Sequence, residues 1–240
     1  MSRPTQLSFS AIPQQLTLSV GLRDDATLAN FYSHQNDLAV QAIEGITEGV
    51  GEPFVFLWGE SGAGCSHLLQ AACHSAGRNQ RSAFYLPLDL LQQGPELLDG
   101  LDQLDLVCID QVHRVIGDPA WEEALFHFFN RIRDAGNSLL IAADAAPRQL
   151  PIALPDLASR LSWGVVYRVH ALDDDGKLAA LRARAHDRGI ELSDEVSQFI
   201  LHRSPRQTGE IFALLDRLDQ ASLSEQRKVT IPFVKQILGW

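Results

Sequence analysis

Short apolar runs alternate with longer amphipathic stretches along the first two thirds of the chain. Each run spans five or six residues without a polar face, which is typical of a strand covered on both faces of a sheet. The stretches between them place apolar residues at helical spacing, as in Leu68–Ala76 and Trp121–Arg133. This alternation predicts an α/β fold with right-handed crossovers and a parallel five-stranded sheet that carries helices on both faces. The predicted strands are Phe54–Trp58, Ala83–Leu88, Leu106–Asp110, Leu139–Ala143 and Val165–Val169.

The two ends of the chain follow other patterns. From about Asp173 onward, four segments begin with Asp, Ser or Thr and continue with apolar residues three and four apart, which predicts helices only. Residues 1–22 mix Gln, Ser, Thr and Pro with scattered apolar residues and show no helical period. We therefore expect a flexible tail over 1–22, an α/β domain over 23–171 and a small all-helical lid domain over 172–240.

Composition narrows the classes of function. The 240 residues carry a formal net charge of -10, which argues against tight sequence-independent binding of DNA by this chain alone. No run approaches the roughly 18 apolar residues of a membrane span, and the N-terminus lacks the layout of a signal peptide. We expect a cytoplasmic protein that does not bind membranes. Its three cysteines show no C-x-x-C spacing, so we expect reduced thiols and neither a disulfide framework nor a zinc site.

The segment GESGAGCS lies between a predicted strand and a predicted helix, where a phosphate-binding loop belongs. Its glycines allow tight turns that point backbone N–H groups at an anion, and Ser66 stands where such loops place a hydroxyl on Mg²⁺. The alternative is an ordinary glycine-rich turn, since Cys65 replaces the lysine of the pattern. The candidate nucleotide-binding residues here are Gly59, Glu60, Ser61, Gly62, Ala63, Gly64, Cys65, Ser66 and His67.

A second motif strengthens the nucleotide-binding interpretation. The run LDLVCIDQ ends in Asp110, the layout of a strand whose aspartate helps to hold Mg²⁺. The next residue is Gln111, and an amide cannot accept the proton of an attacking water. The loop thus keeps the parts that hold phosphates and lacks two that favour hydrolysis. A serine hydrolase elbow around Ser61 is an alternative, but Ala63 stands where that pattern requires glycine.

The position of Cys65 also predicts its reactivity. A thiol among inward-facing amides at a helix N-terminus is favoured as the thiolate. We therefore expect Cys65 to be alkylated faster than Cys73 or Cys108 in the protein without nucleotide.

Three further segments resemble parts of the AAA+ module of the bacterial initiator DnaA. SLLIAADAAPRQL ends its strand at Asp144, where AAA+ ATPases keep a first sensor residue; LPDLASRLSWG places Arg160 in a context similar to the arginine-finger box; and QTGEIFALLDRLDQAS resembles the second-sensor helix. The resemblance covers about residues 23 to 240 and implies an AAA+ P-loop fold. Gly209 stands where relatives carry the sensor arginine, which leaves Arg206, one turn earlier, as the candidate that reaches the phosphates.

The tail resembles the peptide by which one DnaA-related subfamily docks on the replicative sliding clamp. Gln15, Leu16, Leu18 and Val20 match the pattern Q-L-[ST]-L-x-[LF], and residues 6–9 form a weaker second copy. A DnaA-like module with this tail, an acidic charge and no DNA-binding domain after the lid is similar to the Hda subfamily. The alternative for either copy is a chance match in a Gln-rich tail.

The resemblance to the Hda subfamily implies a regulator of replication initiation. Such proteins are understood to hold ADP, with Mg²⁺ between Ser66 and Asp110 if the ion is present, and to have negligible ATPase activity of their own. Their partners are DnaA, whose bound ATP is hydrolysed with the help of Arg160, and the β subunit of DNA polymerase III, through which DNA is contacted only indirectly. A homodimer is one arrangement left open. The alternatives are an active AAA+ ATPase of the helicase-loader type and a DnaA-paralogue adaptor for another partner.

Overall fold

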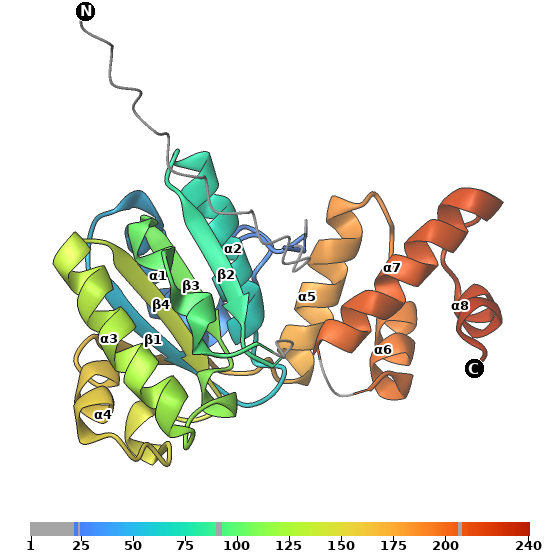
Figure 1. Cartoon of the computed structure of the whole chain (residues 1–240). Helices are drawn as coiled ribbons and strands as arrows, with labels where there is room; N and C mark the ends of the chain where they lie inside the picture. The colour runs from blue at the N-terminus through green and yellow to red at the C-terminus, as the bar shows by residue number, and fades with distance from the viewer. Residues whose placement is uncertain (1–21, 24, 90–92, 206–207) are drawn as a thin grey trace, which may run out of the picture.

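The computed structural model describes residues 22–23, 25–89, 93–205 and 208–240. Its centre is a parallel five-stranded sheet with the strand order β2-β3-β4-β1-β5 (Figure 1). This confirms the predicted fold, with ends that move by only one residue. The strands are β1 (Phe54–Trp58), β2 (Ala83–Pro87), β3 (Leu106–Asp110), β4 (Ser138–Ala143) and β5 (Val165–Arg168).

Two layers of helices cover the sheet. Successive side chains of β1 point to opposite faces, so Val55 and Leu57 belong to one core while Phe54 and Phe56 belong to the other. The first core is closed by α1 (Asp37–Glu48) and α2 (Cys65–Arg78), and the second by α3 (Pro119–Ala135) and α4 (Pro155–Leu161). Short 3-10 turns complete this domain: η1 (His34–Asn36), η2 (Pro95–Leu98), η3 (Leu101–Gln103), η4 (Val112–Arg114) and η5 (Pro147–Gln149).

The C-terminal part of the chain forms a helical lid with a core of its own, beside the sheet in Figure 1. Three of its helices begin at residues whose side chains cap them: Asp173 accepts a hydrogen bond from Gly176 N, Ser193 from Val196 N and Thr230 from Phe233 N. These caps are the polar starts that the sequence displays. The lid helices are α5 (Asp174–Asp187), α6 (Asp194–Arg203), α7 (Thr208–Glu225) and α8 (Ile231–Leu238). In the described part of the chain, no helix has the length and apolar character needed to cross a membrane.

Helix α1 and the segment before it are absent from the sequence prediction. Ile43 and Ile46 of α1 are fully buried against α2, and the helix ends at Gly49, whose φ of 77° lies in the left-handed region. The segment of residues 22–23 and 25–36 precedes this helix and is hydrogen-bonded to side chains of α2. This segment carries no recognised motif, and it lies beside the loop that joins β1 to α2.

Candidate functional site

The loop between β1 and α2 depends on its glycines. A Cβ on Gly59 would lie 2.5 Å from the carbonyl oxygen of Val169, and one on Gly64 would lie 2.8 Å from the Phe31 ring. Gly62 and Gly64 also have φ values of 86° and 106°, a region that L residues with side chains rarely adopt. The backbone therefore requires glycine here for its conformation and for its close approach to neighbouring segments.

This loop forms one wall of a cavity of about 410 Å³. The other walls are the carboxyl ends of β3 and β4, the segment before α1, and lid helices α5 and α7. A cavity of this size suits a small-molecule ligand. Every residue that the sequence assigned to nucleotide binding, apart from Arg206, lines it: Gly59, Glu60, Ser61, Gly62, Ala63, Gly64, Cys65, Ser66, His67, Asp110 and Asp144. Arg206 and the proposed clamp peptide of Gln15, Leu16, Leu18 and Val20 lie outside the described residues.

Asp110 ends β3 at the floor of the cavity, and its side chain is almost inaccessible, with 2 % of the residue exposed. The Tyr85 hydroxyl donates a hydrogen bond of 2.7 Å to one carboxylate oxygen, and the Gln111 backbone N–H donates one of 2.9 Å to the other. Burial nevertheless raises the pKa of Asp110, although hydrogen bonds from Ser66 and Tyr85 act in the opposite direction. A cation at this carboxylate would offset the unfavourable burial of its charge. Ser66 and Asp110 thus bring together two hard oxygen donors, which suits Mg²⁺.

The pKa of the Cys65 thiol is shifted in the direction opposite to the sequence expectation. Burial, with a further contribution from the nearby Asp110 carboxylate, raises the pKa of Cys65 to about 12. The helix N-terminal amide acts in the opposite direction but does not outweigh these two effects. The expected thiolate is therefore wrong for this structure, because desolvation and a neighbouring negative charge dominate over the helix terminus.

Asp144 follows β4 and lines the cavity. Its side chain is 59 % exposed, and one carboxylate oxygen lies 3.5 Å from His113 Nδ1. Its backbone N–H donates a hydrogen bond of 3.2 Å to the same ring nitrogen. Gln111, which precedes η4, adopts the left-handed conformation with φ of 56°, and it also lines the cavity. These two polar side chains could reach a ligand that lies across the loop.

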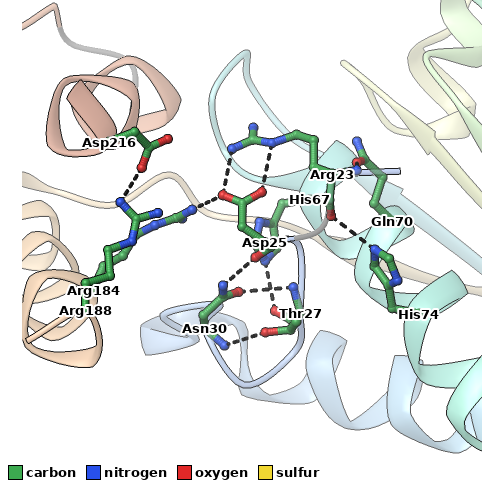
Figure 2. A network of polar contacts seen from close by, with 10 residues as sticks. All are labelled: Arg23, Asp25, Thr27, Asn30, His67, Gln70, His74, Arg184, Arg188 and Asp216. Atoms are coloured by element: carbon green, nitrogen blue, oxygen red, sulfur yellow. Dashed lines mark hydrogen bonds and ion pairs between the residues drawn. The ribbon is translucent and has the colours of Figure 1, made fainter. Parts of the chain in front are cut away.

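The segment before α1 is held against α2 by three polar side chains of that helix (Figure 2). His67 Nε2 lies 2.9 Å from the Thr27 carbonyl oxygen, Gln70 Oε1 accepts a 2.9 Å hydrogen bond from the Arg23 backbone N–H, and His74 Nε2 lies 3.1 Å from the Arg23 carbonyl oxygen. Residues 67, 70 and 74 share one helix face, since three and four residues separate them. This row of polar residues on one face of α2 was the signal that could have revealed the missed segment.

The lid contributes side chains that sequence reasoning missed. Arg184 of α5 pairs with Asp25 of the segment before α1, and Arg188 pairs with Asp216 of α7 (Figure 2). Arg184, Thr208, Gly209 and Phe212 line the cavity from the lid side. Gly209, which the resemblance to DnaA places at the sensor-arginine position, thus lines the cavity without a side chain.

Arg160 lies elsewhere, at the end of α4, and is not among the described residues that line the cavity. Its guanidinium lies 5.6 Å from the ring centre of Trp163 and 6.0 Å from that of Phe129. The Trp163 residue is 58 % exposed, so this half-buried arginine belongs to an aromatic surface of the α/β domain. In this arrangement Arg160 does not contribute to the chain's own cavity.

A buried carboxylate fixes the approach to α4. Glu122 of α3 accepts hydrogen bonds from the backbone N–H groups of Gly117 (2.8 Å), Ala153 (3.1 Å) and Leu154 (2.7 Å). Burial acts to raise the pKa of Glu122, but these three donors outweigh it and lower the pKa. Since Leu154 is the N-cap residue of α4, this contact holds the helix that carries Arg160.

Comparisons with known proteins agree with this architecture. Residues 174–238 match a family model described as "Hda, lid domain", and residues 91–168 match one described as "Bacterial DnaA ATPase domain". Domain III of the Thermotoga maritima replication initiation protein DnaA has a similar structure, with a TM-score of 0.75 and 22 % identity over 91 % of this chain and 98 % of that chain. AMPPCP-bound DnaA from Aquifex aeolicus aligns with a TM-score of 0.68 and 24 % identity, over 81 % of this chain and 65 % of that one.

A more distant structural neighbour is the Thermotoga maritima RuvB Holliday junction branch migration motor. It aligns with a TM-score of 0.62 and 16 % identity over 85 % of this chain and 67 % of that chain. At identities below 25 %, similarity to these structures supports a shared fold only. The two family models match segments of this sequence and support the relationship to DnaA and Hda. The chain is therefore a DnaA-related AAA+ protein with a lid of the Hda type.

Proposed function

We propose that this chain is a regulator of replication initiation that stimulates hydrolysis of the ATP bound to DnaA and so inactivates DnaA. The observation that carries the proposal is that the candidate nucleotide site and Arg160 lie in different places. The loop cavity keeps the glycines, Ser66 and Asp110, whereas Arg160 lies on an aromatic surface outside that cavity. An arginine in such a place can serve the nucleotide of a neighbouring subunit.

The ligand proposed for the cavity is ADP. The structurally similar DnaA from Aquifex aeolicus binds a nucleotide analogue, AMPPCP, and shares the fold in which the loop of the present chain lies. Backbone N–H groups of residues 62–67 would face the phosphates at the N-terminus of α2. Ser66 and Asp110 would hold Mg²⁺, which supplies positive charge to the phosphate oxygens. Cys65 and Gln111 make hydrolysis at this site slow, because neither residue provides the cation or the proton acceptor that the reaction needs.

The hydrolysis itself would occur on DnaA. Negative charge spreads over the γ-phosphoryl oxygens in the transition state, and a guanidinium brought in by a second subunit stabilises it. Trp163 and Phe129 hold the Arg160 guanidinium on their ring faces, which limits the side-chain freedom lost when it docks. Glu122 accepts a hydrogen bond from Leu154 at the start of α4 and so helps to position the helix that carries Arg160.

The decisive experiment measures hydrolysis of DnaA-bound ATP on clamp-loaded DNA with and without this protein. We expect wild-type protein to accelerate hydrolysis, and Arg160→Ala to lose this effect, since an arginine finger contributes about 10³ to 10⁵ in rate. Arg133→Ala is the matched control, because its guanidinium also lies near the Trp163 ring, at 6.0 Å. Unimpaired stimulation by Arg160→Ala, or equal loss in both variants, would contradict the arginine-finger role. Phosphate release by the protein alone should be negligible.

The clamp contact is proposed from the tail sequence and has its own test. Apolar anchors usually carry most of the affinity of such peptides, so Leu16→Ala with Leu18→Ala should abolish binding to the sliding clamp while ADP binding is kept. The double variant Leu7→Ala with Phe9→Ala is the control and should have a smaller effect. The reverse ranking would assign the contact to the first peptide copy.

A further inference from the structure

Arg184 is the most buried charged side chain on the lid side of the cavity. Only 7 % of its side chain is exposed, and its Nε finds no hydrogen-bond partner among the described residues. The guanidinium lies 4.5 Å from the ring centre of Phe212, and both residues line the cavity. Burial, together with the nearby Arg188, lowers the pKa of Arg184, so an additional anion beside it would be stabilising.

The positive charges at the contact between Arg184 and the α/β domain are only partly balanced by negative ones. Asp25 is shared between Arg184 and Arg23, whose guanidinium lies 3.2 Å from the same carboxylate oxygen (Figure 2). Arg188, one turn further along α5, has a carboxylate of its own in Asp216. Two guanidinium groups therefore share one carboxylate, and both line the cavity whose loop carries Cys65 in place of a lysine.

We infer that Arg184 binds the phosphates of the cavity's ligand, and that Asp25 competes with this ligand for the same guanidinium. The inference rests on the proposed binding of a nucleoside diphosphate and adds the group that supplies the positive charge missing at Cys65. In the empty protein, Asp25 holds Arg184 across the junction between lid and α/β domain. When the diphosphate enters, its oxygens take over the hydrogen bonds of the guanidinium, including the free Nε–H donor.

The inference predicts that substitutions of the two partners of one ion pair change the affinity for ADP in opposite directions. Arg184→Gln removes the cation and should weaken ADP binding, whereas Asp25→Asn removes a competing anion and should strengthen it. If the pair served only to hold the lid in place, both substitutions would weaken binding. This contrast separates a ligand-binding arginine from a structural one without relying on either variant alone.

The experiment is calorimetric titration of the full chain with ADP and, separately, with adenosine. For Arg184→Gln we expect ADP binding to weaken about tenfold or more, the size typical of a lost charge-assisted hydrogen bond. Arg184→Lys should recover part of this loss, and Asp25→Asn should bind ADP a few-fold more tightly. Adenosine, which has no phosphate, should bind wild type and Arg184→Gln alike. Arg188→Gln is the control on the same helix and should stay within about twofold of wild type, as expected for a residue outside the cavity.

The possible failures are distinguishable. Absence of ADP binding by the wild-type protein would contradict the proposed function itself. Wild-type binding with an unchanged Arg184→Gln affinity, or with losses in both Arg184→Gln and Asp25→Asn, would overturn only the role of Arg184. Thermal unfolding of each variant identifies any that fails to fold, and Arg184→Lys keeps the test decisive in that case because it retains the charge.

Discussion

Replacement of Asp110 by asparagine should stabilise the empty protein at neutral pH, although it damages the candidate Mg²⁺ site. The carboxylate is almost wholly buried, and burial raises its pKa above the ordinary aspartate value of 3.8. Asparagine keeps an oxygen that accepts the Gln111 N–H, and its NH₂ group can donate to the Tyr85 oxygen. The substitution therefore removes a buried charge and keeps an acceptor for the Gln111 N–H, although the Tyr85 hydroxyl no longer has a carboxylate oxygen to donate to.

The sign of the pH dependence follows from the raised pKa. Between the unfolded and folded pKa values, the folded chain binds a proton that the unfolded chain has released, so rising pH lowers the free energy of unfolding. Each unit of the pKa difference corresponds to about 1.4 kcal/mol. A gain of about 1 kcal/mol would shift the unfolding midpoint by roughly 2 to 4 °C in a chain of this size. The gain should be complete above the folded pKa and should vanish below pH 3.8.

Thermal unfolding from pH 3.5 to pH 8 tests this reasoning for wild type, Asp110→Asn and Asp144→Asn. The Asp144 variant is the control because its carboxyl borders the same cavity but is 59 % exposed, and its effect should be close to zero. Added Mg²⁺ and ADP should stabilise wild type more than Asp110→Asn, since the cation offsets the buried charge. Lower stability of Asp110→Asn at pH 7.5, or a gain of equal size at pH 3.5, would refute the argument.

Three other predictions follow from the same structure. Glu122→Gln should lower the free energy of unfolding by about 1 to 3 kcal/mol at pH 7, and because the pKa of Glu122 is lowered this loss should shrink as urea titrations move to acid pH. Cys65, with its raised pKa, should react with iodoacetamide at pH 7.5 more slowly than free cysteine. The labelling rate is measured by mass spectrometry, and a rate as fast as that of free cysteine would contradict the raised pKa. Trp163→Ala should weaken stimulation of DnaA through Arg160 while Trp163→Phe preserves most of it, and ADP affinity should stay unchanged in both.

The sheet and the lid helices were predictable because their signals are local. Strands buried on both faces need short apolar runs, and the ends of such runs moved by at most one residue in the structure. The helix caps Asp173, Ser193 and Thr230 mark their helices by residue type alone. The loop glycines were equally visible, since positive φ values and close backbone approach leave few other residues for these positions.

The parts of the site that escaped prediction depend on contacts between distant segments. The Arg184 and Asp25 side chains are separated by 159 positions in the sequence, and neither belongs to a motif. The pKa of Cys65 went the wrong way in the sequence argument because local amides were weighed without burial and without Asp110, which only the fold brings near. Local pattern thus predicts the loop, while the charge balance of the cavity requires the tertiary structure.

That charge balance has a consequence for how binding depends on the rest of the molecule. In the described part of the chain, the arginines that line the cavity are Arg23, Arg114 and Arg184, and none comes from the loop itself. A loop lysine moves with the loop, so it can hold a phosphate wherever the lid stands. Here Arg184 lines the cavity from α5 of the lid, and Arg23 lines it from the segment that Gln70 of α2 holds. Affinity for an anionic ligand should therefore depend on the positions of the lid and of this segment, and the bound ligand should in turn restrict both positions, because linkage between two equilibria is reciprocal.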